Sequence, residues 1–87
     1  MKKEKISVLE MRNAIEYVCG SRLYDLSDEQ LLKLDFRKDM KVGNIRLVNI
    51  VVELARRKGI SIAFEPLRAV SDDTVGTLLN AINSQIA

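Results

Sequence analysis

Three observations predict an all-α fold, a small four-helix bundle. Long segments carry apolar residues at a spacing near 3.6 residues, the period of an α-helix. Only one proline interrupts the 87 residues. Helix start and stop signals flank the periodic segments. We therefore expect one domain covering residues 1–87, with helices near residues 7–19, 44–58, 66–70 and 73–86 and a helical turn near residues 28–34.

The first helix has clear signals at both ends. Ser7 followed by Glu10 forms a capping-box pattern, with Ile6 and Met11 placed for a hydrophobic staple. Gly20 suits the left-handed conformation that ends many helices. The capping pattern therefore predicts a helix that begins at residue 7.

A long connection follows the first helix. Ser27 and Gln30 repeat the capping-box pattern and predict the helical turn. Residues 35–43 have weak periodicity and mixed charge, so we interpret them as an ordered loop anchored by Phe36 and Met40.

The second long helix starts at residue 44, where Asn44 suits the N-cap, and Gly59 marks its end. Its apolar residues cover more than one stripe, which predicts packing against several neighbours. We expect residues 60–62 to form an extended connector and Pro66 to open a short third helix.

For the last helix, Asp72 or Asp73 is the predicted cap. The predicted core combines the apolar faces of all helices with the loop anchor. It comprises Val8, Ile15, Val18, Leu31, Phe36, Val48, Val51, Leu54, Ile62, Leu78, Leu79 and Ile82.

Composition excludes several classes of function. Hydrophobic residues make up 47% of the chain and charged residues 30%, an ordinary globular balance. The net charge of +2 does not favour a nucleic-acid or membrane partner. The chain has no histidine and one cysteine, Cys19, so neither an internal disulfide nor a Cys/His zinc site can form within it, and we expect no metal.

No catalytic arrangement is visible either. Cys19 lacks a histidine partner and is interpreted as a buried small apolar residue, so we expect no enzyme. The charged start, residues 1–5, is not followed by a long apolar run. We therefore expect a cytoplasmic protein with no signal peptide and no membrane span.

One segment matches the sequence pattern of a known protein family. The matching residues are Phe36, the pair Asp39-Met40 and the triplet Gly43-Asn44-Ile45. They resemble the acyl carrier protein family of phosphopantetheine-binding proteins, whose pattern is an aromatic, two variable residues, Asp-Leu, two small residues and Asp-Ser-Leu. Downstream, Gly59-Ile60-Ser61-Ile62 resembles the family's exit from the second helix, although Lys58 replaces an aromatic. Thr74-Val75 resembles the opening of the family's fourth helix, about two residues later than is typical. The resemblance implies a first helix, a long loop, a second helix, a short third helix and a closing fourth.

The chain departs from this pattern at the attachment site. Asn44 replaces the serine that carries phosphopantetheine in the family, and Gly43 replaces the acid before it. A carboxamide is not a nucleophile like an activated hydroxyl, so Asn44 is predicted to be unmodified and the prosthetic group to be absent. Apart from its role as a cap, Asn44 could contact an anionic ligand at the helix N-terminus.

The charge of the second helix is also reversed. Family members usually present acids there, whereas residues 41–58 contain five basic residues against Glu53 alone. We predict a partner-docking surface that consists of Lys41, Arg46, Asn49, Arg56 and Arg57. Its partner would be a protein with an acidic surface, for example a biosynthetic enzyme. The helix macrodipole explains Arg56, Arg57 and Lys58 equally well, but not Arg46 in the first turn.

Three functions follow from these patterns. The first is a carrier-like interaction or accessory module that lacks the attachment serine and serves lipid, polyketide or peptide biosynthesis. The second is a functional divergent carrier that uses another acceptor among Ser7, Ser21, Ser27, Ser61, Ser71 and Ser84. The third is a small nucleic-acid-binding bundle that uses Arg46, Arg56 and Arg57. A net charge of +2 gives such a bundle little electrostatic attraction for nucleic acid.

Overall fold

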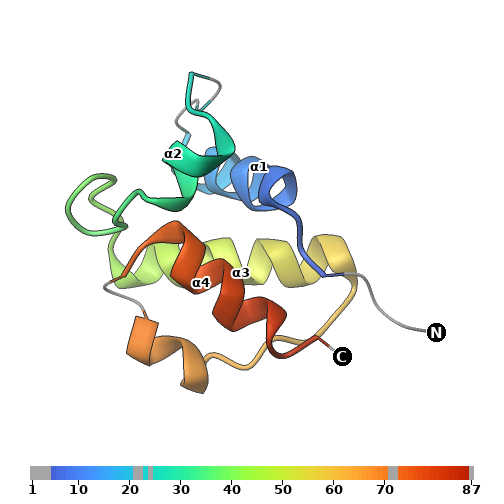
Figure 1. Ribbon diagram of the computed structural model, residues 1–87. Helices are drawn as coiled ribbons and strands as arrows, with labels where there is room; N and C mark the ends of the chain where they lie inside the picture. The colour runs from blue at the N-terminus through green and yellow to red at the C-terminus, as the bar shows by residue number, and fades with distance from the viewer. Residues whose placement is uncertain (1–4, 21–22, 24, 71–72, 87) are drawn as a thin grey trace.

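A computed structural model describes residues 5–20, 23, 25–70 and 73–86, and within these ranges the chain is helical with no strand (Figure 1). The elements are α1 (Val8–Cys19), α2 (Asp28–Leu32), α3 (Asn44–Lys58), the 3₁₀ helix η1 (Glu65–Val70) and α4 (Val75–Asn83). The predicted all-α class is confirmed. No described helix has both the length and the apolar character needed to cross a membrane.

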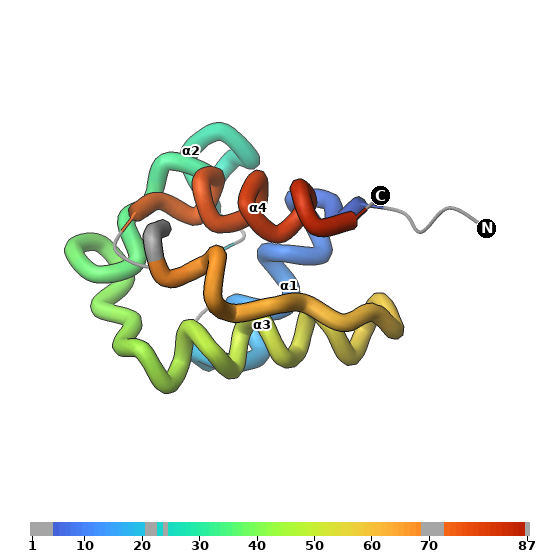
Figure 2. The backbone as a smooth tube through the Cα atoms, turned by 90° about the horizontal axis from the view of Figure 1, so that it is seen from below, coloured from blue at the N-terminus to red at the C-terminus, as the bar shows by residue number. Residues whose placement is uncertain are grey.

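Helix α3 is the longest element. It packs against α1, while α4 packs against both α2 and η1. Gly59 ends α3 with a φ of 65°, in the left-handed region that glycine adopts at low cost. The chain then turns back and runs beside α3 toward η1, as both views show (Figures 1 and 2). This return places η1 near the N-terminal half of α3.

Both predicted capping boxes are present. The Ser7 hydroxyl accepts from the Glu10 backbone N–H at 3.1 Å, and the Glu10 carboxylate accepts from the Ser7 N–H at 3.0 Å. Ser27 and Gln30 make the same reciprocal pair at 3.2 and 2.9 Å. Gly20 closes α1 with a φ of 70°. The sequence predicted these helix ends because capping is a contact between residues close in sequence.

The last two helices differ from the prediction in detail. The N-cap of α4 is Thr74, whose hydroxyl accepts from the Thr77 N–H at 3.3 Å, so Asp73 is not the cap. Asp73 instead accepts the N–H of Thr74 at 2.8 Å, and Asp72 lies outside the described residues. Helix α4 ends at Asn83 instead of residue 86. The short third helix is a 3₁₀ helix that begins one residue before Pro66.

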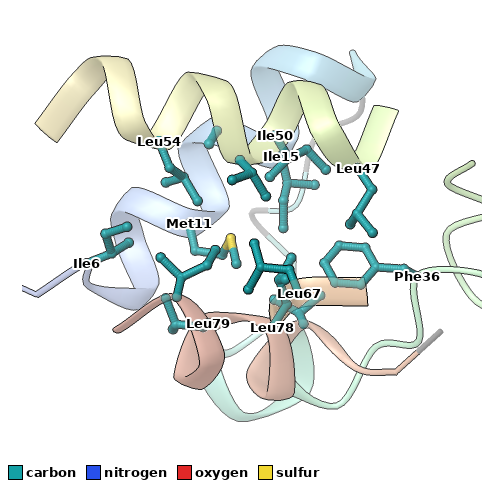
Figure 3. Packing of buried hydrophobic residues seen from close by; sticks show 14 of the residues in the cluster. Ile6, Met11, Ile15, Phe36, Leu47, Ile50, Leu54, Leu67, Leu78 and Leu79 are labelled. Carbon is teal, nitrogen blue, oxygen red and sulfur yellow. The ribbon is translucent and has the colours of Figure 1, made fainter. Parts of the chain in front are cut away.

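The core joins α1, α3, α4 and the loop before α3 (Figure 3). Nine of the predicted core residues are buried: Ile15, Leu31, Phe36, Val51, Leu54, Ile62, Leu78, Leu79 and Ile82. Val8 and Val18 are only partly buried. Val48 was predicted wrongly, since 44% of it is exposed. The core side of α3 is formed by Leu47, Ile50, Val51 and Leu54, and Val48 lies off this stripe.

The loop before α3 is fastened to the start of α4. The Phe36 N–H donates to the Asp73 carbonyl at 3.3 Å, and the Val75 N–H donates to the Leu34 carbonyl at 2.9 Å. The Asp35 carboxylate accepts the backbone N–H groups of the two residues after Phe36, which folds the loop into a tight turn. Phe36, fully buried, then anchors the loop to the core, as predicted.

Candidate functional site

Asn44 lies at the first position of α3, but it is not the N-cap. Gly43 occupies the cap position with φ −84° and ψ 177°, and no side chain caps this helix. The Asn44 carboxamide oxygen instead accepts a hydrogen bond from the Arg37 guanidinium. Arg37 also donates to the Val42 carbonyl at 3.1 Å. The predicted cap was wrong because the cap position falls one residue earlier, at Gly43, so that Asn44 lies within the first turn and its amide meets Arg37.

A cavity of about 500 Å³ opens beside Asn44, between α3 and η1. Apolar side chains line most of it, and Asn44 and Arg68 supply its polar lining. The apolar lining residues are Leu47, Val48, Val51, Phe64, Leu67 and Leu78. This volume lies within the range of small-molecule pockets. The return of the chain after Gly59, which brings η1 alongside α3, creates this cavity.

The five predicted docking residues are all exposed, but they are not equivalent. Arg56 donates to both carboxylate oxygens of Glu53, with its Nε 2.9 Å from Oε1. Arg57 lies 3.6 Å from the same carboxylate and stacks over the Tyr17 ring, 5.4 Å from the centroid. The C-terminal half of α3 therefore has much of its positive charge compensated within the fold.

Glu53 is the buried charge of this helix, with 6% of its side chain exposed. The Arg56 hydrogen bonds, followed by the charges of Arg56 and Arg57, outweigh burial and lower the pKa of this carboxyl group. In sequence, Glu53 is the one acid beside the five basic residues of positions 41–58, and its burial was not predicted. The i, i+3 and i+4 spacing to the two arginines was the available signal.

The uncompensated cations lie toward the N-terminal end of α3. Within the described ranges, neither Lys41 nor Arg46 forms an ion pair. Lys41 lies in the loop three residues before α3 and has a left-handed φ of 53°. Lys58, by contrast, contacts Glu10 of α1 at 2.9 Å and links the two helices. The predicted basic surface is thus strongest around Lys41 and Arg46.

Sequence reasoning missed the apolar part of this surface. Large hydrophobic residues are exposed along α3 and just before η1, namely Ile45 (79% exposed), Val48 (44%), Val52 (49%) and Phe64 (42%). The signal was present, because α3 carries more apolar residues than one buried stripe needs. We predicted that these additional apolar residues of α3 pack against several neighbours, whereas they lie on the surface.

Cys19 is half-buried at the end of α1, and burial raises the pKa of its thiol, an effect that the charge of Arg46 partly opposes. A raised pKa disfavours the reactive thiolate form. No cluster of three or more histidine, cysteine or acidic side chains suited to a metal occurs in the part of the chain that the structure describes.

Comparison of the chain with protein-family models, with curated proteins and with solved structures found no match.

Proposed function

We propose that this protein is an acyl-carrier-protein-like domain that carries no phosphopantetheine and works as a non-catalytic interaction module. One observation carries the proposal. Asn44, the residue at the position of the family's attachment serine, has its carboxamide engaged by Arg37. This position offers no hydroxyl acceptor, and its amide serves to hold the loop to the helix. Asn44 therefore does not fit the role of the attachment residue.

The order of the elements supports the carrier-like part of the proposal. A first helix, a long loop with one short helix, a long second helix, a short third helix and a closing helix follow in the order that the family resemblance implies. The matching loop is anchored by Phe36, the aromatic residue of the motif, which is fully buried. The order of the helices and the burial of the motif's aromatic residue thus both support a carrier-like fold.

The surface of α3 supports the interaction part. Lys41 and Arg46 are exposed cations, and the nearest acid on the helix, Glu53, is bound by its own arginines. A protein with an acidic surface complements this charge, and we propose an enzyme of lipid, polyketide or peptide biosynthesis as that partner.

Intact-mass measurement after incubation with a promiscuous phosphopantetheinyl transferase and coenzyme A tests the proposal. We expect an unchanged mass under conditions that fully modify an authentic carrier protein. A gain of one phosphopantetheine group would overturn the non-carrying function and favour a divergent carrier with another serine as acceptor.

A further inference from the structure

We propose that the exposed face of α3 binds an acidic amphipathic helix of the partner protein, with an apolar side chain of that helix seated in the cavity between α3 and η1. This inference rests on the proposed function, because it names the element that the interaction module recognises.

The centre of this face is apolar. Ile45, Val48 and Val52 are spaced by three and four residues, so they form a stripe of two turns, about 10 Å long. Each is at least 44% exposed, and Phe64 lies beside Val48 at the cavity. An exposed apolar cluster rimmed by polar residues is typical of an interaction site. Stripes with this spacing are what two helices packed side by side present to each other.

Cations border the apolar stripe on both sides. On the side toward α1 lie Arg46, whose charge acts on Cys19, and Arg56, which lines a second hollow with Tyr17 and whose charge Glu53 partly balances. On the side toward η1, Arg68 lines the cavity. The acid nearest to Arg68 is Glu65, at 3.8 Å, so the charge on that side is partly balanced.

This arrangement favours a helix with an apolar stripe and acids on both flanks. Its apolar side chains would meet Ile45 and Val52, and its carboxylates would reach the arginines on either side. Helix-in-groove recognition uses apolar anchors at this spacing, and the charge complementarity would speed association and select against basic partners.

The cavity distinguishes a protein partner from a membrane. It is a hollow of about 500 Å³ with mostly apolar walls, adjoining the stripe at Val48. A protruding leucine or phenylalanine side chain of the partner enters such a hollow and occupies part of it. An interfacial membrane helix, in contrast, inserts a protruding apolar face into the lipid.

A second copy of this chain does not supply the required helix among the described residues. The acidic helix α2 has only five residues, its Leu31 is fully buried, and its Asp28 is paired with Arg12 at 3.2 Å. Helix α2 is therefore not the occupant, and we assign this role to a helix of a different chain.

The test is an NMR titration of the isotope-labelled protein with a designed helical peptide of roughly 18 residues, or five turns. The peptide carries leucines at i, i+3, i+4 and i+7 and glutamates on both flanks. A matched peptide carries lysines in place of the glutamates. We expect saturable shift changes confined to α3 and residues 64–68, with a Kd of roughly 10–100 μM for the acidic peptide and binding at least about tenfold weaker for the basic one.

Variants make the assignment specific. The double variant Ile45→Asp/Val52→Asp should weaken binding of the acidic peptide at least about tenfold. Arg46→Glu, at a cation that forms no ion pair within the described ranges, should weaken it at least about threefold. Leu9→Asp is the matched control, because Leu9 is 62% exposed on α1 and lines neither hollow. It should leave the affinity unchanged, and circular dichroism verifies that every variant is folded.

Several results would overturn the inference. These are no saturable binding at about 1 mM peptide, equal affinity for both peptides, shift changes centred away from α3, or tighter binding to anionic vesicles than to the peptide. The titration does not involve phosphopantetheine. Its failure is therefore distinguishable from a mass gain, which would overturn the proposed function alone.

Discussion

The guanidinium of Arg37 holds the carboxamide of Asn44. With the second bond from Arg37 to the Val42 carbonyl, at 3.1 Å, it fastens the end of the loop to the first turn of α3. The position that would present a reactive hydroxyl in a carrier protein thus serves as one half of a loop clamp.

We expect this clamp to be measurable as a coupling energy. Asn44→Ala and Arg37→Ala should each destabilise the fold modestly, and the double variant should destabilise it by less than the sum of the two. The expected coupling is about 1 kcal/mol, typical of one side-chain hydrogen bond. Urea unfolding of the four proteins measures it. Strict additivity would mean that the contact does not stabilise the loop.

A pair of valines three residues apart tests the orientation of α3. Val51 is 2% exposed and Val48 is 44% exposed. Val51→Ala should lower the free energy of unfolding by about 2 kcal/mol, because it empties a packed site, whereas Val48→Ala should lower it by less than about 1 kcal/mol. Chemical denaturation of both variants measures the two losses of unfolding free energy. Equal losses would contradict the orientation described for α3.

The buried carboxylate should appear in the acid dependence of stability. Arg56 holds the pKa of Glu53 below its ordinary value of 4.5, so the unfolded chain binds the proton more tightly than the folded one. The stabilisation from this group is therefore present above about pH 4.5 and is lost as the pH falls through the lowered folded pKa. Glu53→Gln should reduce stability at pH 7 and flatten the decline below pH 4.5.

Glu29→Gln, on the exposed surface of α2, is the control for overall charge, and at pH 7 it should leave the free energy of unfolding nearly unchanged. Thermal unfolding at a series of pH values measures both variants. An acid decline of the same steepness in Glu53→Gln and in the wild type would show that Glu53 is not linked to folding.

Helix α4 approaches α2 closely at Gly76. A Cβ placed there would lie 3.0 Å from the Leu32 carbonyl oxygen and 3.3 Å from its Cβ. Gly76→Val should cost about 1–3 kcal/mol of stability through overpacking. Gly43→Ala, where a Cβ meets nothing within 4 Å, is the control without a clash. A stabilised Gly76→Val variant would contradict the close approach.

The helix ends were the part of this fold that could be predicted from sequence, because they depend on local signals. The capping boxes at Ser7 and Ser27 and the glycines at the ends of α1 and α3 depend on neighbouring residues, and they gave the helix positions to within a few residues. Asn44 matched the local rule for N-cap residues as well, but its carboxamide accepts a hydrogen bond from Arg37, seven residues earlier. That contact depends on how the loop folds, which no helix propensity describes.

The surface was harder to predict for the same reason. An apolar pattern around most of α3 does not say which apolar side chains face solvent, because this depends on the position of η1. Val48 was consequently placed in the core, although it lines an open cavity. The burial of Glu53 likewise depends on the packing of α3 against other parts of the fold.

The most direct test of the account restores the acceptor. The wild type and the double variant Gly43→Asp/Asn44→Ser are incubated with a promiscuous phosphopantetheinyl transferase and coenzyme A, and the intact masses are compared. The account of a carrier-like bundle that no longer carries a group predicts an unchanged wild type and a variant that gains one phosphopantetheine group, located by peptide mapping at position 44. Modification of the wild type, or a folded variant that stays unmodified while an authentic carrier is converted, would contradict it.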